Sequence, residues 1–110
     1  MRIFILESAE QDIKDLRAYI LFRFSKEQWL TTYGRLKEAL AIRAGHPQAG
    51  TIPEELADLG ATQYRQIISG KNRIIYEIRE HAIFIHIVVD TRKDLQSLLA
   101  RRLLKSHPSH

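Results

Sequence analysis

The apolar residues of this chain change their spacing near residue 64, from a helical period to a strand period. Between residues 8 and 45 they recur every three or four positions, as on one face of an amphipathic helix. From Tyr64 to Val89, short apolar runs alternate with turn residues, as in a series of neighbouring strands. A chain that places helices first and strands afterwards is expected to fold as an α+β domain.

Two helices are predicted in the first half of the chain. The first begins at Ser8, where Gln11 completes a capping box three positions later. Ser25 and Gln28 repeat this arrangement at the start of a second helix, which ends at Gly45-His46-Pro47. Because the connection between them is short, we expect the two helices to form an antiparallel hairpin.

Four strands are predicted, at residues 3–6, 64–68, 73–78 and 83–89. The last of them is apolar at nearly every position, which is typical of a strand that is central in its sheet or covered on both faces. Residues 48–62 hold two glycines, a proline and an acidic cluster, and we expect a loop there with one helical turn.

A further helix is predicted at the end of the chain, where Thr91 and Asp94 form another capping box. Its apolar side carries Leu95, Leu98, Leu99 and Leu103. The expected order is therefore β-α-α-β-β-β-α, with a small, mostly antiparallel sheet packed against the helical hairpin and the last helix. We expect residues 1–105 to form a single domain and residues 106–110 to form a flexible tail.

The charge of the chain is unevenly divided. Residues 1–62 carry 8 Lys+Arg and 9 Asp+Glu, a balance of −1, whereas residues 63–110 carry 9 Lys+Arg and 4 Asp+Glu, a balance of +5. This asymmetry favours an anionic partner for the second half, either nucleic acid or an acidic protein segment. The alternative is a basic surface that only keeps the protein soluble.

Several classes of function lack their sequence signature. The chain has no cysteine, which suits a reducing cytoplasm, and no apolar run long enough to cross a membrane. The five histidines show no paired spacing beside a carboxylate, and no phosphate loop or dinucleotide motif is present, so we expect neither a metal nor a cofactor. Glu54 and Glu55 are adjacent acid–base candidates, but a solvated loop is the simpler interpretation.

Cationic residues fall at positions where they could form an anion-binding surface. Arg65 and Arg73 belong to neighbouring strands, and Arg92 and Lys93 follow the last strand at the start of the final helix. We expect these side chains to converge, and arginine binds phosphate well because its fork is bidentate. Alternatively, Arg73 pairs with a nearby carboxylate such as Glu77. The candidates for binding an anion or a partner are Arg65, Lys71, Arg73, Arg92, Lys93, Arg101 and Arg102.

Several segments, taken in order, resemble the RelE/ParE toxins of bacterial type II toxin–antitoxin systems, in their ParE-like form. The segments are Ser8 to Ile13, Ala18 to Ile20, Tyr64-Arg65, Lys71 to Ile78, Asp90 to Leu99 and Arg101 to Leu104. The resemblance covers essentially the whole chain and implies a RelE/ParE-like fold.

The resemblance implies one of two mechanisms. RelE-like members cut mRNA on the ribosome with a set of basic groups and a proton donor, whereas ParE-like members poison DNA gyrase. Arg65, Arg73 and Arg92 match the basic positions of the family. However, Ile67 replaces a second basic residue, and no Tyr or His follows between residues 91 and 106, which favours binding over cutting.

The leading hypothesis is a cytoplasmic, ParE-like toxin that inhibits DNA gyrase. The resemblance implies that a cognate antitoxin folds over it and neutralises it in a hetero-oligomer. The first alternative is a ribosome-dependent mRNA endoribonuclease that uses Arg65, Arg73 and Arg92. The second is a non-toxic basic module that acts only with its antitoxin in operator binding.

Overall fold

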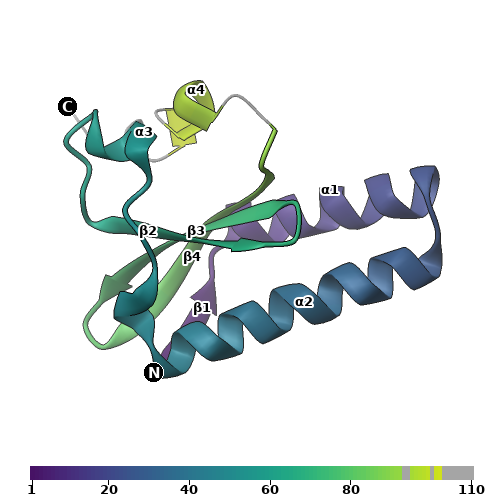
Figure 1. The fold of residues 1–110 in the computed structure, drawn as a ribbon, viewed down its shortest axis with the longest axis horizontal. Coiled ribbons are helices and arrows are strands. Elements are labelled where there is room, and N and C mark those ends of the chain that lie inside the picture. Colours follow the sequence, from purple (N-terminus) through teal and green to yellow (C-terminus); the bar gives the residue numbers. More distant parts are fainter. Residues whose placement is uncertain (93–94, 100, 103–110) are drawn as a thin grey trace.

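The computed structural model describes residues 1–92, 95–99 and 101–102. Its helices and strands follow the predicted order β-α-α-β-β-β-α, and the loop before the second strand holds the expected helical turn and one further short turn (Figure 1). The elements are β1 (Arg2–Ile5), α1 (Glu7–Arg23), α2 (Lys26–Gly45), η1 (Pro47–Ala49), α3 (Glu54–Ala57), β2 (Tyr64–Ser69), β3 (Asn72–Arg79), β4 (Ala82–Asp90) and α4 (Leu95–Leu99).

The four strands form one sheet in the order β1-β4-β3-β2. The strand β4 is central, as its uniformly apolar sequence predicted, and it pairs in parallel with β1 and antiparallel with β3. The pairing between β3 and β4 skips His86, since Ile75 pairs with Ile87 and Tyr76 pairs with Ile85. His86 is thus the extra residue of a β-bulge, the kind of irregularity that re-aims side chains and bends a strand.

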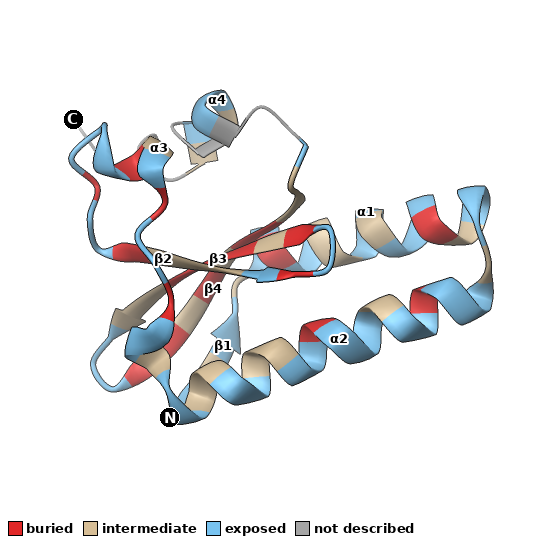
Figure 2. Ribbon diagram, viewed as in Figure 1, coloured by how far each residue is buried: buried red, intermediate tan, exposed pale blue. Residues whose placement is uncertain are grey.

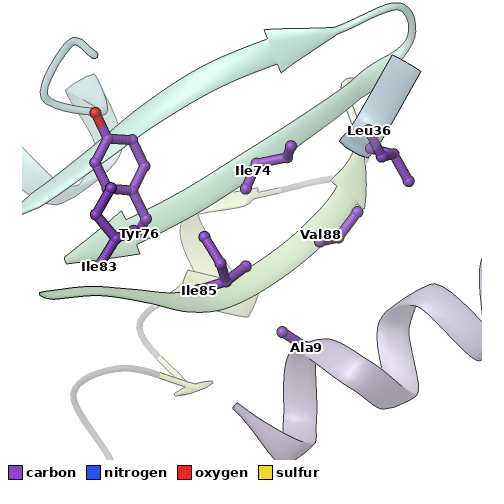
Figure 3. Packing of buried hydrophobic residues seen from close by; sticks show 7 residues of the cluster. All are labelled: Ala9, Leu36, Ile74, Tyr76, Ile83, Ile85 and Val88. Atoms are coloured by element: carbon purple, nitrogen blue, oxygen red, sulfur yellow. The ribbon is translucent and has the colours of Figure 1, made fainter. Parts of the chain in front are cut away.

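The helical hairpin covers one face of the sheet and extends well beyond it (Figure 1). The core on this face joins Ala9 of α1 and Leu36 of α2 to five residues of the strands: Ile74, Tyr76, Ile83, Ile85 and Val88 (Figure 3). Burial is concentrated in β3 and β4, while the outer part of the hairpin is mostly exposed (Figure 2). The sheet therefore anchors the hairpin at its base only.

A second, smaller core lies on the opposite face. It consists of Leu56 from α3, Ala61, Tyr64, Ile75 and Ile87, with Val89 and Leu98 packed against it. This core explains why a four-residue helix forms in the predicted loop, since Leu56 is fully buried there.

The two predicted helix starts have different outcomes. Ser25 caps α2 as predicted, because its hydroxyl oxygen accepts a hydrogen bond from the Gln28 N–H at 3.0 Å. The capping box predicted at Ser8 is wrong, since α1 begins at Glu7 and its N-cap residue is Leu6. The physical reason is that β1 runs directly into the helix: the Leu6 N–H still bonds to β4 while its carbonyl accepts the first helical bond from Glu10.

The predicted strands are each found, with bounds that differ by at most one residue at each end. Gly70 adopts a φ of +60° in the β2–β3 turn. Glu80 and His81 adopt φ values of 49° and 66° in the β3–β4 turn, a region that glycine and asparagine occupy more readily. The predicted capping role of Asp94 and the predicted tail lie outside the described residues.

Candidate partner-binding groove

Arg65, the first predicted site cation, holds the loop that follows α2. Its guanidinium donates to the carbonyl oxygens of Gln48 and Gly50, at 3.2 and 2.9 Å. It therefore lies on the hairpin side of the sheet, where its paired neighbour Tyr76 also points. In the structure, Arg65 therefore holds this loop in place through hydrogen bonds.

Arg73 forms an ion pair with another residue of the chain. Two of its guanidinium nitrogens donate to the Glu55 carboxylate, at 2.9 and 3.0 Å, and its Nε donates to the Gln66 amide at 2.7 Å. Its side chain is only 12% exposed. The alternative interpretation, in which Arg73 pairs with a carboxylate, is therefore correct, but the partner is Glu55 of α3, and Glu77 pairs with Arg79 and His86 instead. This hydrogen bonding with Arg73 lowers the pKa of Glu55.

The expected convergence of Arg65 and Arg73 is wrong. Arg73 shares its sheet face with Gln66, and Arg65 is the neighbour of Gln66 along β2. Side chains of adjacent strand residues point to opposite faces, so Arg65 and Arg73 are separated by the sheet. The two arginines therefore do not form the predicted anion-binding site.

Arg92 lies at the end of β4 and remains largely exposed. Its Nε and one terminal nitrogen both donate to Asp90 at 3.0 Å, and its backbone N–H donates to the same carboxylate at 2.7 Å. This hydrogen bonding lowers the pKa of Asp90. The remaining predicted cations are scattered: Lys71 is exposed in the β2–β3 turn, Arg101 is exposed, and Arg102 binds Asp12. Lys93 lies outside the described residues.

A groove that the sequence did not predict separates α1 from the ends of the strands. It consists of two adjoining cavities, of about 680 and 350 Å³, that share Leu16, Tyr19, Asn72, Asp90 and Arg92. The larger cavity lies along α1 and β4, and the smaller one lies between the two hairpin helices and the β2–β3 turn. Of the predicted cations that the structure describes, Lys71 and Arg92 line this groove.

Apolar and aromatic side chains of α1 line part of the groove, among polar and charged neighbours. Leu16, Ile20 and Phe24 line it from α1 and its C-terminal cap, and Tyr19 lies between both cavities. Tyr19 and Phe24 contact each other edge to face, with ring centroids 6.2 Å apart, and Phe24 is 64% exposed. The amino-acid sequence contains a sign of this apolar wall. Phe24 continues the apolar stripe of α1 beyond the part of the helix that the sheet covers.

Further apolar side chains are exposed at the tip of the hairpin. Phe22 is 86% exposed, and Leu30 of α2 is also exposed. Exposed apolar side chains that gather at one end of a domain mark an interaction surface more often than scattered single residues do. The geometry of the hairpin therefore offers a partner both a groove and an apolar tip.

One further ionisable cluster lies on the opposite face of the sheet. His86 shares a hydrogen bond of 2.9 Å with Glu77, and its ring meets that of Tyr64 edge to face. Burial lowers the pKa of His86 and raises that of Tyr64. Within residues 1–92, 95–99 and 101–102, no group of histidine and carboxylate side chains is arranged to hold a metal ion. The described helices include none that is long and apolar enough to span a membrane.

The comparison with known proteins agrees with this architecture. Residues 3–96 match the family described as the ParE toxin of the type II toxin–antitoxin system parDE. A chain from a solved structure, the chromosomal ParDE TA system from P. aeruginosa, superposes with a TM-score of 0.68 and 13% sequence identity. The match covers 82% of this chain and 95% of that chain, and it shows a shared fold. No curated protein matches the sequence significantly.

Proposed function

The chain belongs to the ParE toxin family of type II toxin–antitoxin systems, and from this premise we propose that it is a toxin that inhibits DNA gyrase by binding it. A cognate antitoxin neutralises it by folding over its exposed surface. The proposal assigns no chemical step to the chain, since binding is sufficient to arrest an enzyme that must move through a cycle of conformations.

The observation that best supports this proposal is the ion pair between Arg73 and Glu55. A ribonuclease of this fold needs several free cations around one phosphate, because the transition state concentrates negative charge there. Arg73 is largely buried and bonded to a carboxylate, and Arg65 is bonded to loop carbonyls on the other face. These contacts support binding over mRNA cleavage.

The exposed apolar residues support the antitoxin as a partner. Phe22, Phe24 and Leu30 leave a substantial apolar area in water, which a stable monomer would usually cover. A segment that is disordered alone and folds on binding can cover such an extended surface. The positive balance of residues 63–110 suits an antitoxin segment that carries acidic residues.

The first experiment separates the three candidate functions. Expression of the chain alone should arrest growth, and the purified protein should leave mRNA intact in a translation extract while it inhibits gyrase. Cuts at codon positions in that extract, without an effect on gyrase, would establish the ribosome-dependent endoribonuclease instead. Harmless expression, together with operator binding only in the presence of the antitoxin, would establish the non-toxic module.

A further inference from the structure

Among the residues that the structure describes, the groove has a carboxylate without an ion-pair partner at one end and two cations without one at the other. We propose that it binds a partner segment in one fixed direction, with a cationic side chain near Asp15, apolar side chains along the middle and carboxylates near Arg35 and Lys71. This inference rests on the proposed function, because the occupant is the antitoxin segment that folds over this chain. Asp15 and Arg35 are then residues that determine which antitoxin is accepted.

The two cavities form one continuous site. Tyr19, Asn72 and Arg92 line both of them, so a bound segment passes from one to the other without leaving the surface. The side of this path formed by α1 is apolar in its middle, since Leu16 and Tyr19 line both cavities and Ile20 and Phe24 line the second. The facing side carries Asn72 and the Asp90–Arg92 ion pair. A segment that crosses the middle therefore needs apolar side chains on the side that faces α1.

The first end is acidic despite the basic character of the chain. Asp12, Asp15 and Asp90 all line the larger cavity. Asp12 is neutralised by Arg102, and Asp90 is neutralised by Arg92. Asp15 accepts a hydrogen bond from the neutral Gln11 side chain at 2.8 Å, and no cation among the described residues pairs with it. Within the described residues, Asp15 is therefore the carboxylate at this end that has no ion-pair partner.

The second end has the opposite sign. Arg35 of α2 and Lys71 of the β2–β3 turn both line the smaller cavity. Neither side chain forms an ion pair with any residue in the described part of the chain. Two cations at one end and a carboxylate at the other make binding in the reverse direction unfavourable, because each end would then face its own charge.

This pattern favours a peptide over a nucleic acid. A phosphate backbone is negative along its whole length and would meet the Asp15 carboxylate at one end of the path. An amphipathic peptide with a Lys or Arg at one end and Asp or Glu at the other complements both ends and the apolar centre. The overall positive charge of the chain would instead predict a uniformly acidic partner. A uniformly acidic segment would be repelled by Asp15, whereas a segment with a cation at that end would be attracted by it.

The test measures binding of the purified antitoxin encoded beside this chain to four charge-reversal variants. Asp15→Lys and Arg35→Glu alter the two ends of the groove, and each should weaken binding by about three- to tenfold at low salt. Glu38→Lys and Arg17→Glu are the matched controls, since both residues are exposed on the hairpin and line neither cavity. We expect the controls to bind within about twofold of the unaltered chain.

The sign of the Asp15 effect decides the outcome. Tighter or unchanged binding by Asp15→Lys, with a folded variant, would overturn the directional groove and indicate a uniformly acidic segment. Asp15→Asn provides a milder change should the lysine variant not fold, and it should also weaken binding. An unaltered chain that does not bind the antitoxin at all would overturn both the proposed partner and this inference, whereas the first outcome leaves the partner intact.

Discussion

Asp12 on α1 and Arg102 at the end of the described chain form a two-point ion pair, with N···O distances of 3.0 and 3.1 Å. The same carboxylate accepts the Val88 N–H at 3.0 Å, and the same guanidinium donates to the His86 carbonyl at 2.9 Å. The strand β1 ends opposite Ile85. Asp12 and Arg102 therefore bind the backbone groups of β4 that lie beyond its strand partner.

Replacement of Asp12 should destabilise the fold more than replacement of Arg102. Asp12→Ala leaves the Val88 N–H without an acceptor and removes the carboxylate partner of the partly buried guanidinium, and we expect it to lower the free energy of unfolding by about 2–3 kcal/mol. Arg102→Gln should cost about 1 kcal/mol, because the Asp12 carboxylate still accepts the Val88 N–H. Urea unfolding measures both values, with the exposed Lys14→Ala on α1 as the control. Equal, small effects for both variants would contradict this assignment.

The Glu55–Arg73 pair should make stability depend on pH in the acid range. Because hydrogen bonding to Arg73 lowers the pKa of Glu55 below its value of 4.5 in the unfolded chain, the folded state binds fewer protons there. The stabilisation is complete above this unfolded pKa and is lost as the pH falls through the folded one. A Glu55→Gln variant should be less stable at pH 7 and should lose less stability between pH 7 and the acid range than the unaltered chain does.

His86 should add a pH dependence at a higher pH. Burial lowers its pKa below the value of 6.5 in the unfolded chain, against the opposing effect of Glu77, and the positive charges of Arg79 and Arg102 lower it further. The folded state therefore resists protonation, and stability falls as the pH drops below about 6.5. We expect His86→Gln to flatten the pH profile of the melting temperature in that range. A profile that keeps its slope in this variant would assign the effect to another group.

The β3–β4 turn should accept a stabilising substitution. Glu80 and His81 both hold positive φ values, which the sequence Asn-Gly adopts at lower cost in a two-residue hairpin turn. The double change Glu80→Asn and His81→Gly should raise the free energy of unfolding by about 1 kcal/mol, which corresponds to an increase of about 4 °C in the melting temperature. The matched change at exposed positions of α2, Lys37→Asn and Glu38→Gly, should lower the melting temperature instead.

Much of the fold could be predicted from local pattern. The Ser25 cap, the hairpin and the central position of β4 each depend on a few neighbouring residues, whose chemistry is the same in any context. The start of α1 could not be predicted in this way, since the pairing of Leu6 with β4 is a contact between distant segments. The helical turn expected in the loop is found as α3, and the burial of Leu56 under the sheet holds it in place.

The candidate site was harder to predict for the same reason. The separation of Arg65 from Arg73 depends on the register between β2 and β3 as well as on strand alternation, and the choice of Glu55 over Glu77 as the partner of Arg73 depends on how α3 packs. The groove combines residues of α1, α2 and the β2–β3 turn, so no single segment of sequence contains it. The aromatic residues Tyr19 and Phe24 were its only local sign.

The central claim is that this chain inhibits DNA gyrase, and a supercoiling assay tests it most directly. Purified chain should block supercoiling of relaxed plasmid by gyrase or trap cleaved plasmid DNA, in proportion to its concentration, and prior mixing with its antitoxin should restore supercoiling. The Glu38→Lys variant should inhibit as strongly as the unaltered chain. Full supercoiling activity in the presence of a folded, growth-arresting chain would contradict the claim.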